Sequence, residues 1–142
     1  KYISSEMAAR YSNAPDYPEV AKRALAQMVK QTGDAKFDER DMMKRGVIVR
    51  HLILPGHIKE SKEAIRYLYE TYGDQIYISI MNQYTPMPGI EKRFKNLGRT
   101  ITQKEYDEVV DYAIDLGVEN GFIQEGETAK ESFIPQFDDT GL

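Results

Sequence analysis

The sequence contains no cysteine, so the chain by itself has no disulfide, no thiolate zinc site, no ligand for an iron–sulfur cluster and no cysteine nucleophile. It also lacks a basic excess. The net charge is −4 and the isoelectric point about 5.3, which argues against a general nucleic-acid or anionic-membrane surface. No apolar run approaches the ~20 residues of a membrane span, and no signal peptide is visible, so we expect a cytoplasmic protein.

The chain has 142 residues, of which 41% are hydrophobic and 30% charged. This is the composition of a soluble globular protein, and the length suffices for a hydrophobic core. We therefore expect residues 1–142 to form a single domain. The chain begins at Lys1 rather than at methionine, which leaves both a processed product and an excised piece open.

The most distinctive stretch runs from Gly46 to His57 and reads Gly-Val-Ile-Val-Arg-His-Leu-Ile-Leu-Pro-Gly-His. A short, nearly continuous apolar run predicts a strand buried on both faces, as in a parallel sheet covered by helices. The Pro-Gly pair ends the strand. Because burying an unpaired guanidinium is costly, Arg50 either pairs with a buried carboxylate or faces a cavity that holds an anion. A structural ion pair, or a strand-end arginine that reaches solvent, is the alternative. We expect its neighbour His51 to donate a hydrogen bond on the outer face of the strand.

Periodicity predicts helices over residues 4–11, 17–32, 59–72 and 102–115, and strands over 46–54, 76–84 and 121–124. Asp16 is the expected cap of the first long helix, and Thr102 and Glu105 have the spacing of a capping box. The order of the elements predicts right-handed βαβ units and a parallel sheet. Residues 34–45 predict a surface loop with a possible short hairpin. Residues 85–98 predict a long loop at the carboxyl end of a strand, where α/β folds build their sites.

The second strand alternates in character. Ile76, Ile78 and Ile80 form an aliphatic face that suits covering helices, whereas the opposite face is mixed and suits a lumen or a pocket. The helical residues expected to face the core are Val20, Ala21, Ala24, Leu25, Met28, Val29, Ala64, Ile65, Leu68, Tyr69, Tyr72, Tyr106, Val109, Val110, Ala113 and Ile114.

The sequence has no dinucleotide-binding glycine motif, no P-loop and no zinc-protease motif. His51 and His57 are separated by a Pro-Gly turn and cannot share a helix face, so we expect no metal site. His57 is expected in a loop or at a helix start. The charges at Glu60–Glu63 and Asp107–Asp111 predict solvated helix faces.

Several segments resemble the C-terminal half of radical S-adenosylmethionine proteins, in the branch called pyruvate formate-lyase-activating-enzyme-like. The segments are Val49-Arg-His-Leu-Ile-Leu-Pro-Gly56 with the helix after it, and Tyr77-Ile-Ser-Ile-Met-Asn-Gln-Tyr84 with a proline two residues on. The helix that starts Tyr17-Pro-Glu-Val-Ala-Lys and the segment Glu131-Ser-Phe-Ile-Pro-Gln-Phe-Asp138 are also similar to this branch. The resemblance implies a parallel sheet of βα units that forms part of a (β/α)6 partial TIM-like barrel. It also implies that the N-terminal half, which binds a 4Fe–4S cluster on a C-x3-C-x2-C loop, is absent.

The resemblance assigns cofactor-binding roles to a few residues. Arg50 would point into the barrel, with Ile48, Leu52 and Leu54 on the same face, and would bind the carboxylate of S-adenosylmethionine; a guanidinium matches a carboxylate bidentately. Gln83, with Asn82 and Tyr84 as neighbours, would contact the adenine. Lys1 would be the remnant of an Asp-x-Lys motif near the same carboxylate. The resemblance implies no catalytic residue and no metal ligand in this chain.

The implied function is that of a radical S-adenosylmethionine enzyme. Such an enzyme generates a 5′-deoxyadenosyl radical that abstracts hydrogen from a protein, such as a glycyl radical enzyme, or from a small substrate. The chain alone is then inactive and binds no iron, its partner is the missing N-terminal half, and its open sheet edge favours self-association. Two other classes stay open. One is a stand-alone α/β module that uses Arg50 to bind a small anionic ligand, and the other is a structural domain that recruits a protein partner.

Overall fold

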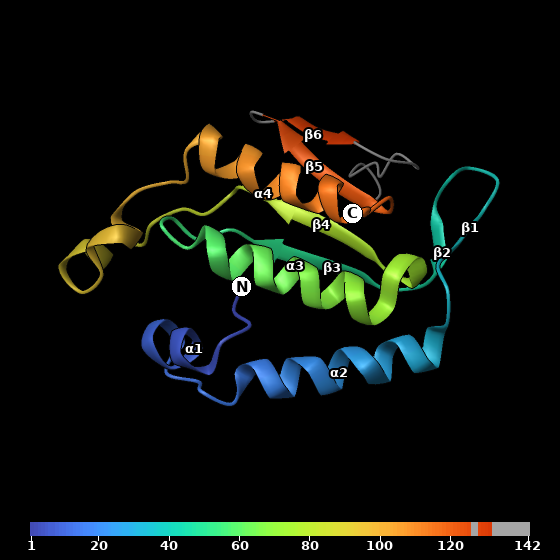
Figure 1. Cartoon of the computed structure of the whole chain (residues 1–142), viewed down its shortest axis with the longest axis horizontal. Helices are drawn as coiled ribbons and strands as arrows, with labels where there is room; N and C mark the ends of the chain where they lie inside the picture. The colour runs from blue at the N-terminus through green and yellow to red at the C-terminus, as the bar shows by residue number, and fades with distance from the viewer. Residues whose placement is uncertain (126–127, 132–142) are drawn as a thin grey trace.

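Three parallel strands form the centre of the molecule, and the helices pack against one of their two faces (Figure 1). The computed structural model describes residues 1–125 and 128–131. The main sheet has the strand order β3-β4-β5-β6, in which β6 is antiparallel to β5. Its strands are β3 (Ile48–Leu52), β4 (Tyr77–Met81), β5 (Gly121–Glu125) and β6 (Thr128–Glu131). The predicted α/β class with a parallel sheet is therefore confirmed, and β6 is an addition to it.

The helices begin and end close to the predicted residues. They are α1 (Ser5–Ser12), α2 (Tyr17–Thr32), α3 (Ile58–Tyr72) and α4 (Gln103–Leu116), with short 3-10 turns η1 (Gly73–Gln75), η2 (Ile90–Lys92) and η3 (Lys95–Gly98). The predicted capping box of α4 is present, because Thr102 and Glu105 each accept a hydrogen bond from the other's backbone N–H. The predicted side-chain cap at Asp16 is wrong. Its backbone is already helical (φ −86°, ψ −6°), whereas a capping residue is extended.

The two faces of the sheet have different surroundings. The register places Val49 and His51 of β3 beside Ile78 and Ile80 of β4, and this face meets the helices through a continuous apolar core. The predicted aliphatic face of β4 is thereby confirmed. The core consists of Leu25, Val29, Val47, Ile53, Ile65, Leu68, Ile76, Ile78, Ile80, Tyr106, Val109, Val110, Ala113 and Val118.

The opposite face carries Ile48, Arg50 and Leu52 of β3 and Ser79 and Met81 of β4, and no helix in the described ranges covers it (Figure 1). Tyr77 of β4 lies on the same side but is buried, with ring contacts to Phe37 and Phe122, so we call only the other five residues the open face. Arg50 is exposed and the other four are half-buried. The prediction that the strand at residues 46–54, which is β3, is buried on both faces is therefore wrong. In the described ranges, helices pack against one face of β3 and not against the other.

Helix α2 buries less than its sequence predicts. Leu25 and Val29 reach the core, but Val20 is 45% exposed and Met28 46% exposed. The helix lies alongside α3, next to β3, which is the last strand of the described sheet on that side (Figure 1). Only one flank of α2 therefore has a neighbour to pack against, and part of its predicted apolar stripe meets solvent.

Residues 34–45 contain the predicted short hairpin, formed by β1 (Lys36–Phe37) and β2 (Met43–Arg45). The ring of Phe37 contacts Tyr77 with a centroid distance of 5.2 Å, so the base of the hairpin lies against the amino end of β4. Gly46 follows β2 with φ +132°, and a Cβ there would approach the backbone of Ala35 to 2.7 Å, so closure of the hairpin requires glycine. The segment Glu131–Asp138, which contributes to the resemblance, lies outside the described residues after its first position.

Two isoleucines on helices test this assignment of the core. Ile65 on α3 is 0% exposed, whereas Ile114 on α4, which the sequence places in the core, is 48% exposed. We expect Ile65→Ala to lower the free energy of unfolding by about 2–5 kcal/mol, because it leaves a cavity. The matched change Ile114→Ala is expected to cost less than about 1 kcal/mol. Urea titration of both variants measures the difference, and equal losses would contradict the packing described.

Candidate functional site

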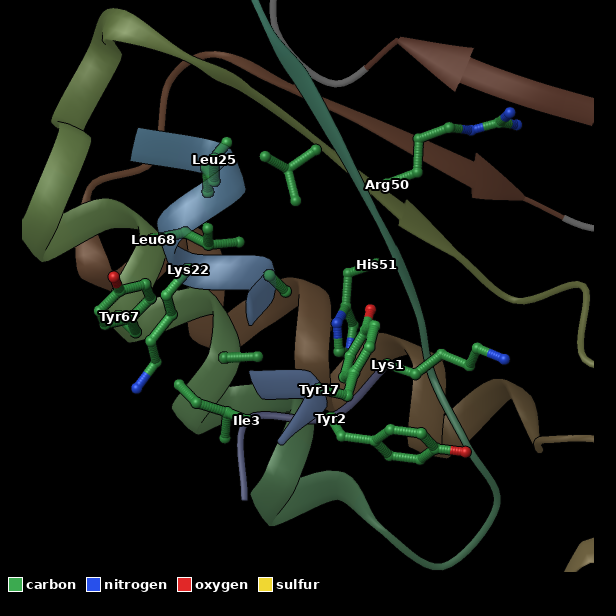
Figure 2. A pocket seen from close by; sticks show the side chains of 13 residues that line it. Lys1, Tyr2, Ile3, Tyr17, Lys22, Leu25, Arg50, His51, Tyr67 and Leu68 are labelled. Carbon is green, nitrogen blue, oxygen red and sulfur yellow. The ribbon is translucent and has the colours of Figure 1, made fainter. Parts of the chain in front are cut away.

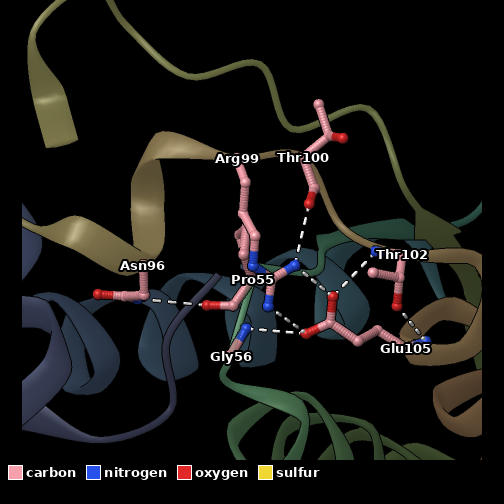
Figure 3. Close-up of polar contacts among 7 residues, drawn as sticks. All are labelled: Pro55, Gly56, Asn96, Arg99, Thr100, Thr102 and Glu105. Atoms are coloured by element: carbon pink, nitrogen blue, oxygen red, sulfur yellow. Dashed lines mark hydrogen bonds and ion pairs between the residues drawn. The ribbon is translucent and has the colours of Figure 1, made fainter.

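The candidate site lies at the carboxyl ends of β3 and β4, where the turn after β3 meets the long loop after β4. One carboxylate joins these segments (Figure 3). Glu105, in the first turn of α4, accepts two hydrogen bonds from the guanidinium of Arg99, at 2.7 and 3.1 Å. It also accepts one from the backbone N–H of Gly56 and one from that of Thr102, each at 2.9 Å. The loop, the turn and the helix are thus tied at one point.

The contacts of Glu105 also fix its charge. The Arg99 hydrogen bonds, with the backbone N–H groups of Thr102 and Gly56, lower the pKa of Glu105 from 4.5 to about 2. Hydrogen bonds to a charged form favour that form, so the carboxylate stays ionised over the physiological range.

A second polar cluster fixes the same turn from the other side. The Asn96 amide donates to the carbonyl of Pro55 at 3.3 Å and lies 3.2 Å from both the Tyr11 hydroxyl and His57 Nε2. The Tyr11 hydroxyl is itself 2.6 Å from His57 Nε2. Partial burial, and after it the charge of Arg10, lower the pKa of His57, so the neutral ring is favoured. His57 precedes α3, as the sequence predicts, and links that helix start to α1 and the loop.

Arg50 lies on the open face with its side chain directed away from the helices (Figure 2). It is exposed, and it forms no ion pair or hydrogen bond with any residue in the described ranges. Of the alternatives left open for Arg50, a buried carboxylate partner is not found in this part of the chain, and the side chain reaches solvent. Its neighbour across the sheet is the half-buried Ser79. The N–H donors of the guanidinium are therefore available to an external anion.

The residues expected near an adenine follow β4 directly. Gln83 is exposed, Asn82 is half-buried, and the Tyr84 hydroxyl donates to the carbonyl of Leu97 at 2.8 Å. Gln83 lies four residues beyond Ser79, the partner of Arg50, which corresponds to roughly 13 Å along an extended strand. Arg50 and residues 82–84 therefore contact the same ligand only if it is elongated and lies along the sheet.

Lys1 lies elsewhere. Its ammonium group is 5.9 Å from the ring centroid of Tyr2, and its side chain lines a pocket of about 110 Å³ on the helix side of β3 (Figure 2). Arg50 lines the same pocket from β3, but Figure 2 shows its side chain apart from that of Lys1.

His51 forms part of the wall of that pocket. It is 3% exposed, and its Nε2 atom lies 2.8 Å from the Ser61 hydroxyl on α3. This confirms that His51 meets a hydrogen-bonding neighbour on the outer face of the strand. Burial lowers the pKa of His51 from 6.5 to about 3, so the ring is neutral.

The prediction that Glu60 lies on a solvated helix face is wrong. It is 6% exposed rather than solvated, and its carboxylate accepts from the backbone N–H of Ser4 at 3.2 Å and from the Ser4 hydroxyl at 2.8 Å. Ser4 in turn caps α1 through Met7 N–H. A signal was present in the sequence, because Glu60 shares a helix face with Ala64 at a spacing of four residues.

No protein-family model, no curated protein and no solved structure matches this chain. In the described ranges, no three His, Cys, Asp or Glu residues are grouped so as to hold a metal ion. The helices of the same ranges are too short or too polar for one of them to cross a membrane. The features of the molecule that bear on its function are therefore Arg50, the open face and the loop at the carboxyl ends of the strands.

The pKa of His51 predicts a pH-dependent stability. The unfolded ring is protonated as the pH falls below about 6.5, whereas the folded ring stays neutral until about pH 3, so stability is lost between these values. We expect a loss of about 2 kcal/mol by pH 5 that is absent from His51→Gln. Urea unfolding of both proteins at several pH values measures it; because both retain His57, their difference isolates His51. Parallel pH profiles would refute the neutral buried ring.

The Glu105 network predicts a second stability effect. Glu105→Gln removes the charged acceptor of Arg99, and we expect it to lower the free energy of unfolding by about 1–2 kcal/mol at neutral pH. The folded pKa of Glu105 is depressed, so its contribution is present above about pH 4.5 and is lost as the pH falls through about 2.

The matched control for this prediction is Glu108→Gln on the same helix. Its ion pair with Lys62 is 3.3 Å long and half exposed, so we expect a change below about 1 kcal/mol. Thermal and urea unfolding at neutral pH compare the two variants, and equal effects would show that Glu105 is an ordinary surface carboxylate.

Proposed function

We propose that residues 1–142 are the C-terminal half of a partial (β/α)6 barrel from a radical S-adenosylmethionine enzyme of the pyruvate formate-lyase-activating-enzyme-like type. The observation that carries this proposal is the parallel sheet with helices on one face and an exposed arginine on the other. Parallel sheets are normally covered on both faces, and in a barrel the inner face is covered by the remaining strands. The unpaired side of β3 in the described sheet is where such strands would continue.

The open face suits one part of S-adenosylmethionine. Arg50 presents a charged guanidinium with no described protein partner, and a carboxylate is its natural bidentate ligand. Residues 82–84, at the carboxyl end of the next strand, would approach the adenine at the far end of the same ligand. Lys1 lines the same pocket as Arg50, and no hydrogen bond or ion pair of the described residues joins the two side chains.

The iron–sulfur cluster does not fit this chain. Its ligands are thiolates, and none of the 142 residues is a cysteine. The cluster and the first strands therefore belong to the proposed N-terminal half, together with the reductive chemistry that generates a substrate radical. The role proposed for these 142 residues is to hold the amino-acid end of the cofactor through Arg50 and to form one wall of the barrel.

A second candidate is a stand-alone α/β module that binds a carboxylate or phosphate ligand at Arg50. The exposed, unpaired guanidinium favours this candidate as much as the first. The coding sequence separates them. An upstream C-x3-C-x2-C in the same reading frame supports the barrel half, and a start codon at or near the position before Lys1 supports the module.

Arg50 supplies the direct test in the enzyme that contains both halves. We expect Arg50→Ala to weaken S-adenosylmethionine binding about tenfold to a hundredfold, because a charge-assisted hydrogen bond is worth about 1.5–3 kcal/mol. Isothermal titration calorimetry measures the affinity, and the visible absorption of the cluster shows whether it is intact. Arg45→Ala, which removes an exposed arginine of the hairpin, is the matched control. Unchanged affinity in a folded Arg50→Ala protein would exclude this role.

A further inference from the structure

A cluster of cations lies beyond the carboxyl ends of the strands. Residues 87–98 contain Lys92, Arg93 and Lys95, and Arg10 of α1 lies beside them; we call residues 87–98 and Arg10 the basic lobe. All four cations are exposed, and none forms an ion pair with a residue of the described ranges. Glu91 is the one acidic residue of the lobe. In a chain with a net charge of −4, this is a local reversal of sign.

Two of these cations are ordered by one aromatic ring. The guanidinium carbons of Arg10 and Arg93 lie 5.8 and 5.3 Å from the ring centroid of Phe94. Phe94 in turn packs edge to face against Tyr11, with a centroid distance of 4.8 Å. Cation–π contacts hold arginine side chains in place, so less conformational entropy is lost when an anion binds them.

The backbone beneath the cations is also fixed. Asn96 is bonded to Pro55, and the carbonyl of Leu97 accepts from Tyr84. A Cβ at Gly98 would lie 2.6 Å from the Cβ of Glu91, so η2 and η3 pack too closely for any other residue there. Figure 1 shows this gold segment extending past the strand ends at the left of the molecule. The cations are therefore presented on a rigid, protruding surface.

We infer that the basic lobe binds an acidic segment of a partner protein. A protruding patch of four unpaired cations attracts carboxylates over several ångströms and raises the rate of encounter. Met87, 71% exposed at the start of the lobe, adds an apolar contact of the kind found in protein interfaces. A nucleic acid is the weaker candidate, because the remaining chain is acidic and offers no extended basic stripe for a phosphate backbone.

The role of this partner rests on the proposed function. The lobe adjoins the edge of the sheet where a barrel would admit its substrate, so the acidic segment would belong to a protein substrate. Binding of the segment itself needs neither cofactor nor cluster, so it can be measured on the 142-residue chain.

The probe is a fluorescent oligoglutamate peptide, titrated with the chain at low and at physiological ionic strength while its anisotropy is recorded. We expect the peptide to bind, and its affinity to fall as the salt concentration rises. The double variant Lys92→Gln with Lys95→Gln is expected to lower this affinity about fivefold or more. Among the described residues neither lysine makes a cation–π contact, so the change leaves the Phe94 stack in place. Arg93→Gln is a second variant with the same expected direction.

The matched control is Arg23→Gln with Lys30→Gln, which removes two exposed cations of α2. It changes the net charge by the same amount as the lysine pair of the lobe. We expect its affinity to stay within about twofold of the unaltered chain. Equal losses in the two pairs, no peptide binding, or tighter binding of an oligonucleotide of equal charge would each overturn the inference. Peptide binding by the lobe, in an enzyme that contains both halves and fails to bind S-adenosylmethionine, would refute the proposed function alone.

Discussion

The ionised carboxylate of Glu105 joins three parts of the chain that are far apart in sequence. It accepts from Arg99 in the loop, from the N–H of Gly56 after β3 and from the start of its own helix. A carboxylate with so many donors is compensated for its partial burial. Its hydrogen bonds tie the start of α4 to the turn after β3 and to residues 85–102, the loop that also carries most of the basic lobe.

The adjacent residues Arg50 and His51 illustrate how a strand accommodates two polar side chains. Successive side chains of a strand point to opposite faces, so two adjacent residues can have entirely different surroundings. His51 is buried under α3, loses its charge and bonds to Ser61. Arg50 lies on the face without helices, where its side chain is exposed. The position of one arginine thus distinguishes the face that packs from the face that is available for a ligand.

Both proposals concern anions, but they use different physical means. On the open face, Arg50 is a single exposed guanidinium beside a half-buried strand surface, which suits one carboxylate. The basic lobe instead groups several exposed cations, where each contact is weak and screened by salt. Such a surface favours an extended partner with many charges. The two sites adjoin the same edge of the sheet, because the loop that carries the lobe starts at the end of β4.

The sequence by itself determined the α/β class, the helix boundaries, the capping box and the alternation of Ile76, Ile78 and Ile80, because these features arise from residues a few positions apart. Which residues cover each face of a helix or strand depends on the tertiary structure. In it Val20 is exposed, Glu60 is buried against the start of the chain, and Arg50 has no described partner. It also brought together the parts of the basic lobe, which lie on α1 and on a distant loop. Local periodicity gives the direction of a side chain, but its burial and its partners depend on segments that are distant in sequence.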